Sequence, residues 1–170
     1  ESDVLRLVAE GKTAKEIAHK VKGQTVVDAF CGIGGNAIGF AKVCPKVFAV
    51  DIDEARLAMA HHNTDVYGLK NVEFIVGDFL QLAPDIKADV VFLDPPWGGP
   101  DYIKKTEFVL ADFAPDGNLL LETAFRYYSK VILRVPKNFR MAELETLNKS
   151  FVVQNNLLHG HLIARTVYFN

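Results

Sequence analysis

The sequence has few cysteines, no long apolar run and no excess of positive charge. Cys31 and Cys44 are its only cysteines. Without a signal peptide or a metal-binding spacing, we expect reduced thiols in a protein of the nucleus or cytoplasm that is not secreted. No apolar run approaches the length of a membrane span. The net charge of −2 and a pI of about 6.2 argue against a long electrostatic contact with nucleic acid, and leave a nucleotide or an RNA end as partner.

The length of 170 residues, of which 49% are hydrophobic, is that of one domain with a substantial core. We expect this domain over residues 23–170, after a helical segment over residues 1–22 that either packs or folds over a ligand as a lid. Gly11 divides that segment into two short predicted helices, and Thr13 with Glu16 predicts a capping box for the second. The chain begins Glu1-Ser2-Asp3 without a methionine, which indicates a fragment or a processed chain.

Apolar segments of strand length alternate with segments of helix length, which predicts an α/β fold. The predicted strands are 25–29, 46–50, 72–76, 88–93 and 129–135, and the predicted helices are 36–43, 54–67, 117–128 and 140–148. Residues 151–158 and 162–169, joined by His159-Gly160-His161, predict a closing antiparallel hairpin. We interpret the two histidines as turn residues because no third ligand or partner acid accompanies them.

Four aspartates stand at or near the carboxyl ends of the first four predicted strands. They are Asp28, Asp51, Asp78 and Asp94. Open α/β sheets bind ligands at the carboxyl ends of their strands, so we expect the four to surround one crevice. An adenosyl ligand with a positive sulfonium and ammonium suits this acidic crevice better than the pyrophosphate of a dinucleotide.

A glycine turn follows the first predicted strand. Its sequence, Cys31-Gly32-Ile33-Gly34-Gly35-Asn36, leads into a helix and is typical of a nucleotide-binding corner. Gly32, Gly34 and Ala37 also satisfy the dinucleotide fingerprint, and Asp51 lies 19 residues beyond Gly32, near the spacing of a ribose-binding acid. A nicotinamide-dependent oxidoreductase is therefore an alternative, although it leaves the proline loop at residues 94–100 unexplained.

Other strand-end residues are assigned to an adenosyl ligand. We expect Asp51 to accept both ribose hydroxyls, and Asp78 to accept the adenine amino group with Phe79 against the ring. Asn63, near the end of the 54–67 helix, is expected either to hydrogen-bond a base edge or to lie on a polar helix face. Lys137, in the segment after the fifth predicted strand, is expected either to meet a phosphate or to be a solvated lysine.

The loop Asp94-Pro95-Pro96-Trp97-Gly98-Gly99-Pro100 is the most specific motif. Its two consecutive prolines stiffen the loop and remove two donors, which is expected to leave the Asp94 carboxylate free to accept from an amino group. Trp97, the only tryptophan, is close enough to stack on a planar base whose amine points at Asp94. The alternative is a turn capped by a buried tryptophan.

Together these motifs resemble the class I S-adenosylmethionine-dependent methyltransferases over nearly the whole chain. The closer resemblance is to the trimethylguanosine synthase family, which methylates the guanine N2 of 7-methylguanosine RNA caps. It is carried by residues 27–36, 51–53, 63, 66–68, 77–79 and 88–102.

The resemblance implies a Rossmann-like class I methyltransferase fold with helices on both faces of a seven-stranded sheet, in the order 3-2-1-4-5-7-6 with the last strand antiparallel. It implies S-adenosyl-L-methionine as cofactor and S-adenosyl-L-homocysteine as product. The implied cofactor-binding residues are Asp28, Phe30, Gly32, Gly34, Asn36, Asp51, Ile52, Asp78, Phe79 and Asp94. The implied catalytic residues are Asp94, Pro95, Pro96 and Trp97, and the implied substrate-binding residues are Asn63, Trp97, Tyr102 and Lys137.

The implied partner is 7-methylguanosine-capped RNA, small nuclear or nucleolar, and we expect a monomer without membrane contact. The resemblance implies Ser or Asp at position 94. A relative has Arg where this chain has Lys137, and the lysine would weaken bidentate phosphate contact. Two alternatives stay open: an amino-methyltransferase acting on adenine or guanine within ribosomal RNA or DNA, since Asp-Pro-Pro before an aromatic is common to such enzymes, and a cofactor-binding module without activity.

Overall fold

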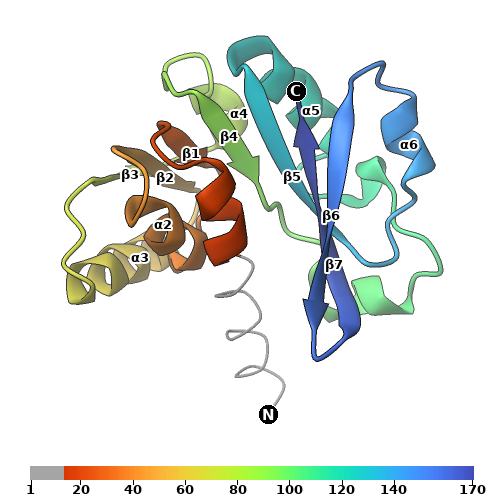
Figure 1. Cartoon of the computed structure of the whole chain (residues 1–170), viewed down its shortest axis with the longest axis horizontal. Helices are drawn as coiled ribbons and strands as arrows, with labels where there is room; N and C mark the ends of the chain where they lie inside the picture. The colour runs from red at the N-terminus through yellow and green to blue at the C-terminus, as the bar shows by residue number, and fades with distance from the viewer. Residues whose placement is uncertain (1–13) are drawn as a thin grey trace.

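A seven-stranded sheet in the order β3-β2-β1-β4-β5-β7-β6 forms the middle layer of the computed structural model, which describes residues 14–170 (Figure 1). The strands are β1 (Val26–Asp28), β2 (Val47–Asp51), β3 (Val72–Val76), β4 (Val90–Leu93), β5 (Lys130–Pro136), β6 (Phe151–Leu158) and β7 (His161–Phe169). The strands β1 to β5 pair in parallel, and β7 runs antiparallel to both β5 and β6. The predicted strand order and the antiparallel last strand are confirmed.

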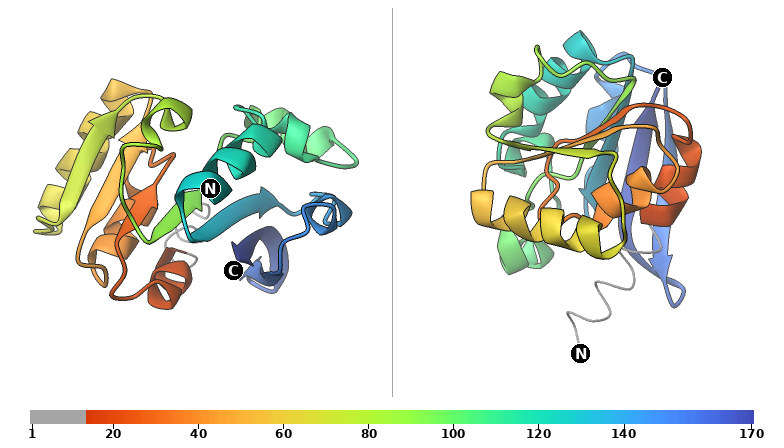
Figure 2. Two further views of the ribbon diagram at one scale, coloured as in Figure 1. Left: turned by 90° about the horizontal axis from the view of Figure 1, so that it is seen from above. Right: turned by 90° about the vertical axis from the view of Figure 1, so that its left-hand side faces the viewer.

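Helices cover both faces of the sheet, as Figure 2 shows. One face carries a helix over residues 14–20, α2 (Gly35–Ala41) and α3 (Glu54–Val66), and the other carries α4 (Phe79–Leu82), α5 (Gly117–Tyr127) and α6 (Ala142–Glu145). Two 3₁₀ segments, η1 (Gly99–Lys104) and η2 (Leu110–Asp112), lie between β4 and α5. No helix within residues 14–170 has both the length and the apolar character that crossing a membrane requires.

The central strands are buried on both sides because each faces a helical layer. Val27, Val91 and Leu133 pack under α4 and α5, while Val26 and Phe92 pack under α2 and α3. This two-sided burial is the reason that these strands read as continuous apolar runs rather than alternating ones. The same sheet brings the carboxyl ends of β1 to β4 to one edge.

Three element predictions need correction. The helix predicted over residues 140–148 is a single turn, Ala142–Glu145, and the short helix α4 was not predicted. His161 begins β7 instead of lying in the turn; the turn is His159-Gly160, whose positive φ angles of 49° and 81° are those of a two-residue hairpin connection. Short elements are missed because one turn has no helical periodicity to detect.

The N-terminal segment is described only in part. Ile17, Ala18 and Val21 are buried on the α2 and α3 side of the sheet, and the Glu16 carboxylate accepts from Gln154 of β6 at 2.8 Å. Thr13 and the first of the two predicted helices lie outside the described residues. The lid therefore stays a prediction, whereas the second predicted helix packs on the domain.

Candidate active site

Three of the four strand-end aspartates lie together. Asp28 ends β1, Asp51 ends β2 and Asp94 follows β4, and these strands are neighbours in the sheet. The negative charges of Asp94 and Asp51 both act on Asp28. Asp78 follows β3 next to β2, where the Gly77 amide donates to the Asp51 carbonyl at 3.0 Å. The carboxyl edge of the sheet is therefore strongly acidic.

Asp28 lies at the centre of this edge and is fully buried. Neither of its carboxylate oxygens has a hydrogen bond of standard geometry. Burial, and then the charges of Asp94 and Asp51, raise the pKa of Asp28 well above 3.8, and the backbone amides of Ala37 and Phe30 offset only part of that rise. A buried acceptor of this kind is costly, and a cationic group placed beside it would satisfy it.

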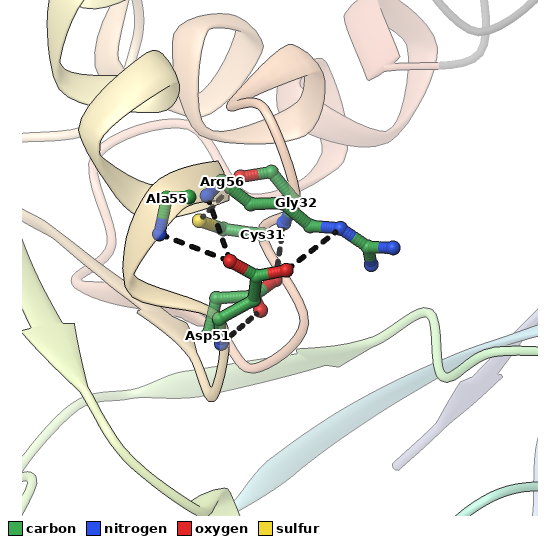
Figure 3. Close-up of polar contacts among 6 residues, drawn as sticks. Cys31, Gly32, Asp51, Ala55 and Arg56 are labelled. Carbon is green, nitrogen blue, oxygen red and sulfur yellow. Dashed lines mark hydrogen bonds and ion pairs between the residues drawn. The ribbon is translucent and has the colours of Figure 1, made fainter.

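Asp51 is a buried carboxylate that holds the glycine turn by hydrogen bonding. One oxygen accepts from the Gly32 amide at 2.7 Å and the other accepts from the Asp53 amide at 2.9 Å (Figure 3). A carboxylate has about four acceptor positions, so both oxygens keep capacity for a ribose. Asp53 in turn accepts from the Ala55 and Arg56 amides and caps α3, which fixes the helix behind Asp51.

The glycine turn fits closely against α3. Gly34 has a φ of +90°, and a Cβ there would lie 3.0 Å from the Cβ of Ala60, so both conformation and space require glycine. The Asn63 side-chain amide donates to the Ile33 carbonyl at 2.9 Å. Asn63 therefore holds the turn, a role that neither sequence interpretation of this residue included.

The remaining predicted cofactor residues are placed at the same edge. Asn36 is half-buried in the first turn of α2, and Phe30 is half-buried, with its ring 6.3 Å from that of Phe79. Ile52, directly after β2, is 75% exposed. An exposed aliphatic side chain next to Asp51 is available to cover a ligand. Cys31, in the turn, is buried, and burial with the charges of Asp28 and Asp51 raises the pKa of its thiol.

Phe79 corrects one prediction. Its side chain is 2% exposed and stacks on Tyr128 with ring centroids 6.1 Å apart, so its ring belongs to the core and does not line the crevice. Asp78 caps α4 by accepting from the Leu80 amide at 2.9 Å, and this cap directs the first residue of α4 inward. As the first helical residue, Phe79 keeps a backbone amide without an intrahelical partner.

The loop after β4 is held in place by packing. Pro95 is buried, and the carbonyl of exposed Pro96 accepts from the Ala114 amide at 3.4 Å. Trp97 is half-buried and meets the Tyr102 ring edge to face, with centroids 5.1 Å apart at 76°. Tyr102 therefore orients the indole of Trp97, which stays partly exposed.

Asp94 is not free, contrary to the sequence prediction. Its Oδ2 accepts from Nη1 of Arg134 at 3.0 Å, and the exposed fractions of the two side chains are 19% and 6%. Sequence reasoning missed Arg134. The available signal was a single arginine within the apolar part of β5 that follows Lys130, because a buried charge requires a partner.

The loop after β5 is tied to the loop after β4. The Asn138 side-chain amide donates to the carbonyls of Tyr102 and Lys105, at 3.1 and 2.9 Å. Lys137 is exposed, and its carbonyl accepts from Nη1 of Arg165, a half-buried residue of β7, at 2.7 Å. Arg165 therefore adds a second cation beside Lys137, and sequence reasoning missed it.

A groove of about 260 Å³ lies elsewhere. It is lined by Lys20, Gln24, Lys130 and Tyr168 among others, at the amino ends of β4 and β5. These amino ends are opposite to the carboxyl ends of the strands, where the aspartates lie. It therefore does not compete with the acidic edge as the active site.

Comparison with known proteins identifies the class and then the family. The chain superimposes on magnesium protoporphyrin IX methyltransferase from Synechocystis PCC 6803, crystallised with bound S-adenosylmethionine, with a TM-score of 0.72 and 18% identity over 95% of this chain and 79% of that one. The chain therefore has the Rossmann-like fold of the class I methyltransferases. The family model described as RNA cap guanine-N2 methyltransferase matches residues 23–164, and the chain belongs to this family.

Relatives agree with this assignment. The chain is 38% identical to trimethylguanosine synthase of Schizosaccharomyces pombe over 92% of this chain, and 31% identical to trimethylguanosine synthase of Saccharomyces cerevisiae over 71% of it. It spans 70% and 41% of those two proteins. It is an S-adenosylmethionine-dependent methyltransferase for the guanine N2 of RNA caps. The nicotinamide-dependent alternative is wrong, and the antiparallel β7 also departs from the dinucleotide-binding strand order.

Proposed function

We propose that this chain methylates the guanine N2 amine of 7-methylguanosine caps at the acidic edge, with Asp94 and Trp97 holding the base. The observation that carries this proposal is the buried Asp28 carboxylate next to Asp94, which has no hydrogen bond of standard geometry and which a cationic methyl donor would satisfy. When bound, S-adenosylmethionine supplies an electrophilic methyl group on a positive sulfonium.

The cofactor residues have separate tasks in this proposal. Asp28 faces the ammonium group, and Asp51 accepts from the ribose hydroxyls with the oxygen capacity that its two backbone contacts leave. Gly32 has no atom within 4 Å of where a Cβ would stand, so the turn offers open space for a ligand. Ile52 covers the adenine, and the Asp78 carboxylate accepts from its amino group.

The base residues position a weak nucleophile. The guanine amine is weakly nucleophilic because its lone pair is delocalised into the ring, so near-attack geometry supplies much of the rate. Asp94 accepts from one amine hydrogen and orients the lone pair toward the methyl group. Trp97, oriented by Tyr102, stacks on the positively charged 7-methylguanine. The proton leaves to water after transfer, so no strong general base is needed.

The cap phosphates are proposed to meet Lys137 and Arg165. These residues lie together at the end of β5, and the Arg165 guanidinium keeps further N–H donors beyond the one given to the Lys137 carbonyl. Arginine supplies the planar guanidinium that Lys137 lacks.

Arg165→Gln is expected to raise the KM for 7-methyl-GTP roughly fivefold, an effect of about 1 kcal/mol for one exposed charge contact. Initial rates at low and high salt measure this, and the difference should shrink as salt screens the contact. With the nucleoside 7-methylguanosine, which has no phosphates, the variant should match the parent protein. An equal loss on both substrates would contradict a phosphate contact.

Mass spectrometry of 7-methyl-GTP after incubation with the protein and S-adenosylmethionine tests the proposed function. We expect a gain of one or two methyl masses, which also counts the transfers. No gain, with cofactor binding confirmed by calorimetry and methylation of ribosomal RNA or DNA in a parallel reaction, would favour the polymer-base alternative.

We further propose that the RNA substrates are small nuclear and nucleolar RNAs, and that the chain works as a monomer in the nucleus or cytoplasm. The family description supports capped RNA as the substrate, and the choice among capped RNAs follows the resemblance alone. The buried, unpaired thiols of Cys31 and Cys44 support a reducing compartment. Light scattering of the protein with capped RNA would measure its oligomeric state and stoichiometry.

A further inference from the structure

Arg134 and Asp94 form a buried ion pair at the edge of the proposed active site. Leu133 of β5 pairs with Leu93 of β4, so Arg134 and Asp94 are the next residues along two adjacent parallel strands. The guanidinium Nη1 lies 3.0 Å from the Asp94 Oδ2, and the Arg134 side chain is only 6% exposed. Register and burial therefore place these two groups against each other.

The surroundings of this pair are negatively charged. Asp94 and Asp51 both act on the buried Asp28, so three carboxylates share one small region. Arg134 is the buried cation that a salt bridge connects to this group. The positive charge of Arg134 therefore offsets part of the repulsion between Asp94 and Asp28.

Stability does not account for this pair. Removing two charges from water costs about as much as their attraction returns, so apolar residues of similar volume are often equally stable in such positions. The Nε of Arg134 is also buried without a hydrogen-bond partner, which adds to the cost. A guanidinium that is kept under these conditions points to a task in the site.

We propose that Arg134 is a positioning residue for methyl transfer: its guanidinium binds the Asp94 carboxylate and fixes its orientation toward the guanine amine. This inference rests on the proposed role of Asp94 as the acceptor for that amine. Arg134 itself touches neither substrate nor cofactor in this account. The proline loop fixes the backbone of Asp94, and Arg134 fixes its side chain.

Steady-state kinetics of Arg134 variants on 7-methyl-GTP provide the test. Arg134→Met is expected to lower kcat roughly 100-fold, the size of effect that a displaced reacting group produces, while both KM values change by less than about threefold. Arg134→Lys keeps the positive charge but not the planar guanidinium, and its kcat should lie between those of Arg134→Met and the parent protein. The control is Arg126→Met, which removes an ion pair of the same 3.0 Å length on the exposed side of α5 and should leave kcat unchanged.

A double-variant comparison separates this inference from the role of Asp94. Asp94→Ala alone should lower kcat roughly 100-fold, and parental activity would overturn the proposed role of Asp94. Adding Arg134→Met to Asp94→Ala should change kcat by less than about threefold, because Arg134 then has nothing to position. The double variant removes both members of the ion pair together, so it can be compared with a folded Asp94→Ala protein even where Arg134→Met does not fold.

Two outcomes would overturn the inference. One is a parental kcat in Arg134→Met, and the other is a further large loss when Arg134→Met is added to Asp94→Ala. A merely structural role for Arg134 would lower the melting temperature and leave the kcat of the folded protein near that of the parent. Thermal unfolding of each variant, measured with and without S-adenosylmethionine, distinguishes that case.

Discussion

Trp97→Ala is expected to raise the KM for the capped substrate roughly 100-fold and to leave the Kd for S-adenosylmethionine within about twofold. Stacking on a base and a cation–π contact with 7-methylguanine together contribute about 3 kcal/mol. The indole is half-buried and oriented by the Tyr102 ring at 5.1 Å, so it is available to a base without reorganising the core. Initial rates give the KM, and calorimetry gives the cofactor Kd.

Trp97→Phe is the matched control, because it keeps an aromatic ring while reducing the stacking area. We expect it to retain most of the affinity for 7-methyl-GTP. The same variants tested on GTP, which lacks the positive base, should show a smaller difference. Equal losses of cap and cofactor binding in Trp97→Ala would instead mean that Trp97 supports the fold through its contact with the core.

Asp28→Asn is expected to stabilise the protein without ligand, increasingly so as the pH rises. Burial and the neighbouring Asp94 and Asp51 raise the pKa of Asp28 well above 3.8 in the folded state. Above pH 3.8 the unfolded chain releases the proton that the folded chain keeps. The free energy of unfolding of the parent protein therefore falls by about 1.4 kcal/mol per pH unit until the folded pKa is reached.

Asparagine does not titrate, so the free energy of unfolding of the variant does not fall with pH for this reason. Denaturant unfolding at several values between pH 4 and pH 8 measures the difference, which should be smallest at pH 4. Asp85→Asn, at an exposed aspartate, is the control and should show no such trend. A stability difference that is constant with pH would contradict a raised pKa at Asp28.

The same substitution is expected to weaken S-adenosylmethionine binding. A neutral amide cannot pair with the cofactor ammonium, and removing a charged hydrogen bond costs about 1.5–3 kcal/mol, or roughly 10- to 150-fold in Kd. Greater stability together with poorer binding would identify Asp28 as a residue kept for function at a cost to the fold. Tight binding in Asp28→Asn would assign the ammonium to another group.

Much of the site could be predicted because its residues are ordered by local pattern. Asp28, Asp51 and Asp94 each end or follow an apolar strand, and a parallel sheet brings such ends to one edge. The glycine turn was equally predictable, since Gly32, Gly34 and Gly35 directly follow a strand and precede a helix. These features depend on neighbours in the sequence.

The errors and omissions concern contacts between distant segments. Arg134 is 40 residues from Asp94, and Arg165 is 28 residues from Lys137, so neither pairing leaves a periodic signal. The prediction that the Phe79 ring contacts adenine was wrong because the cap at Asp78 directs that ring into the core against Tyr128.

The sequence by itself determined the α/β class, the positions of the strands and the acidic strand ends, because apolar periodicity and turn residues act locally. Its motifs also carried the resemblance that the family match confirms. Only the tertiary structure decided which groups form ion pairs and hydrogen bonds at the site, and which charges act on each other. Burial left Asp28 unpaired, and strand register placed Arg134 beside Asp94, since both depend on how the sheet is assembled rather than on any one segment.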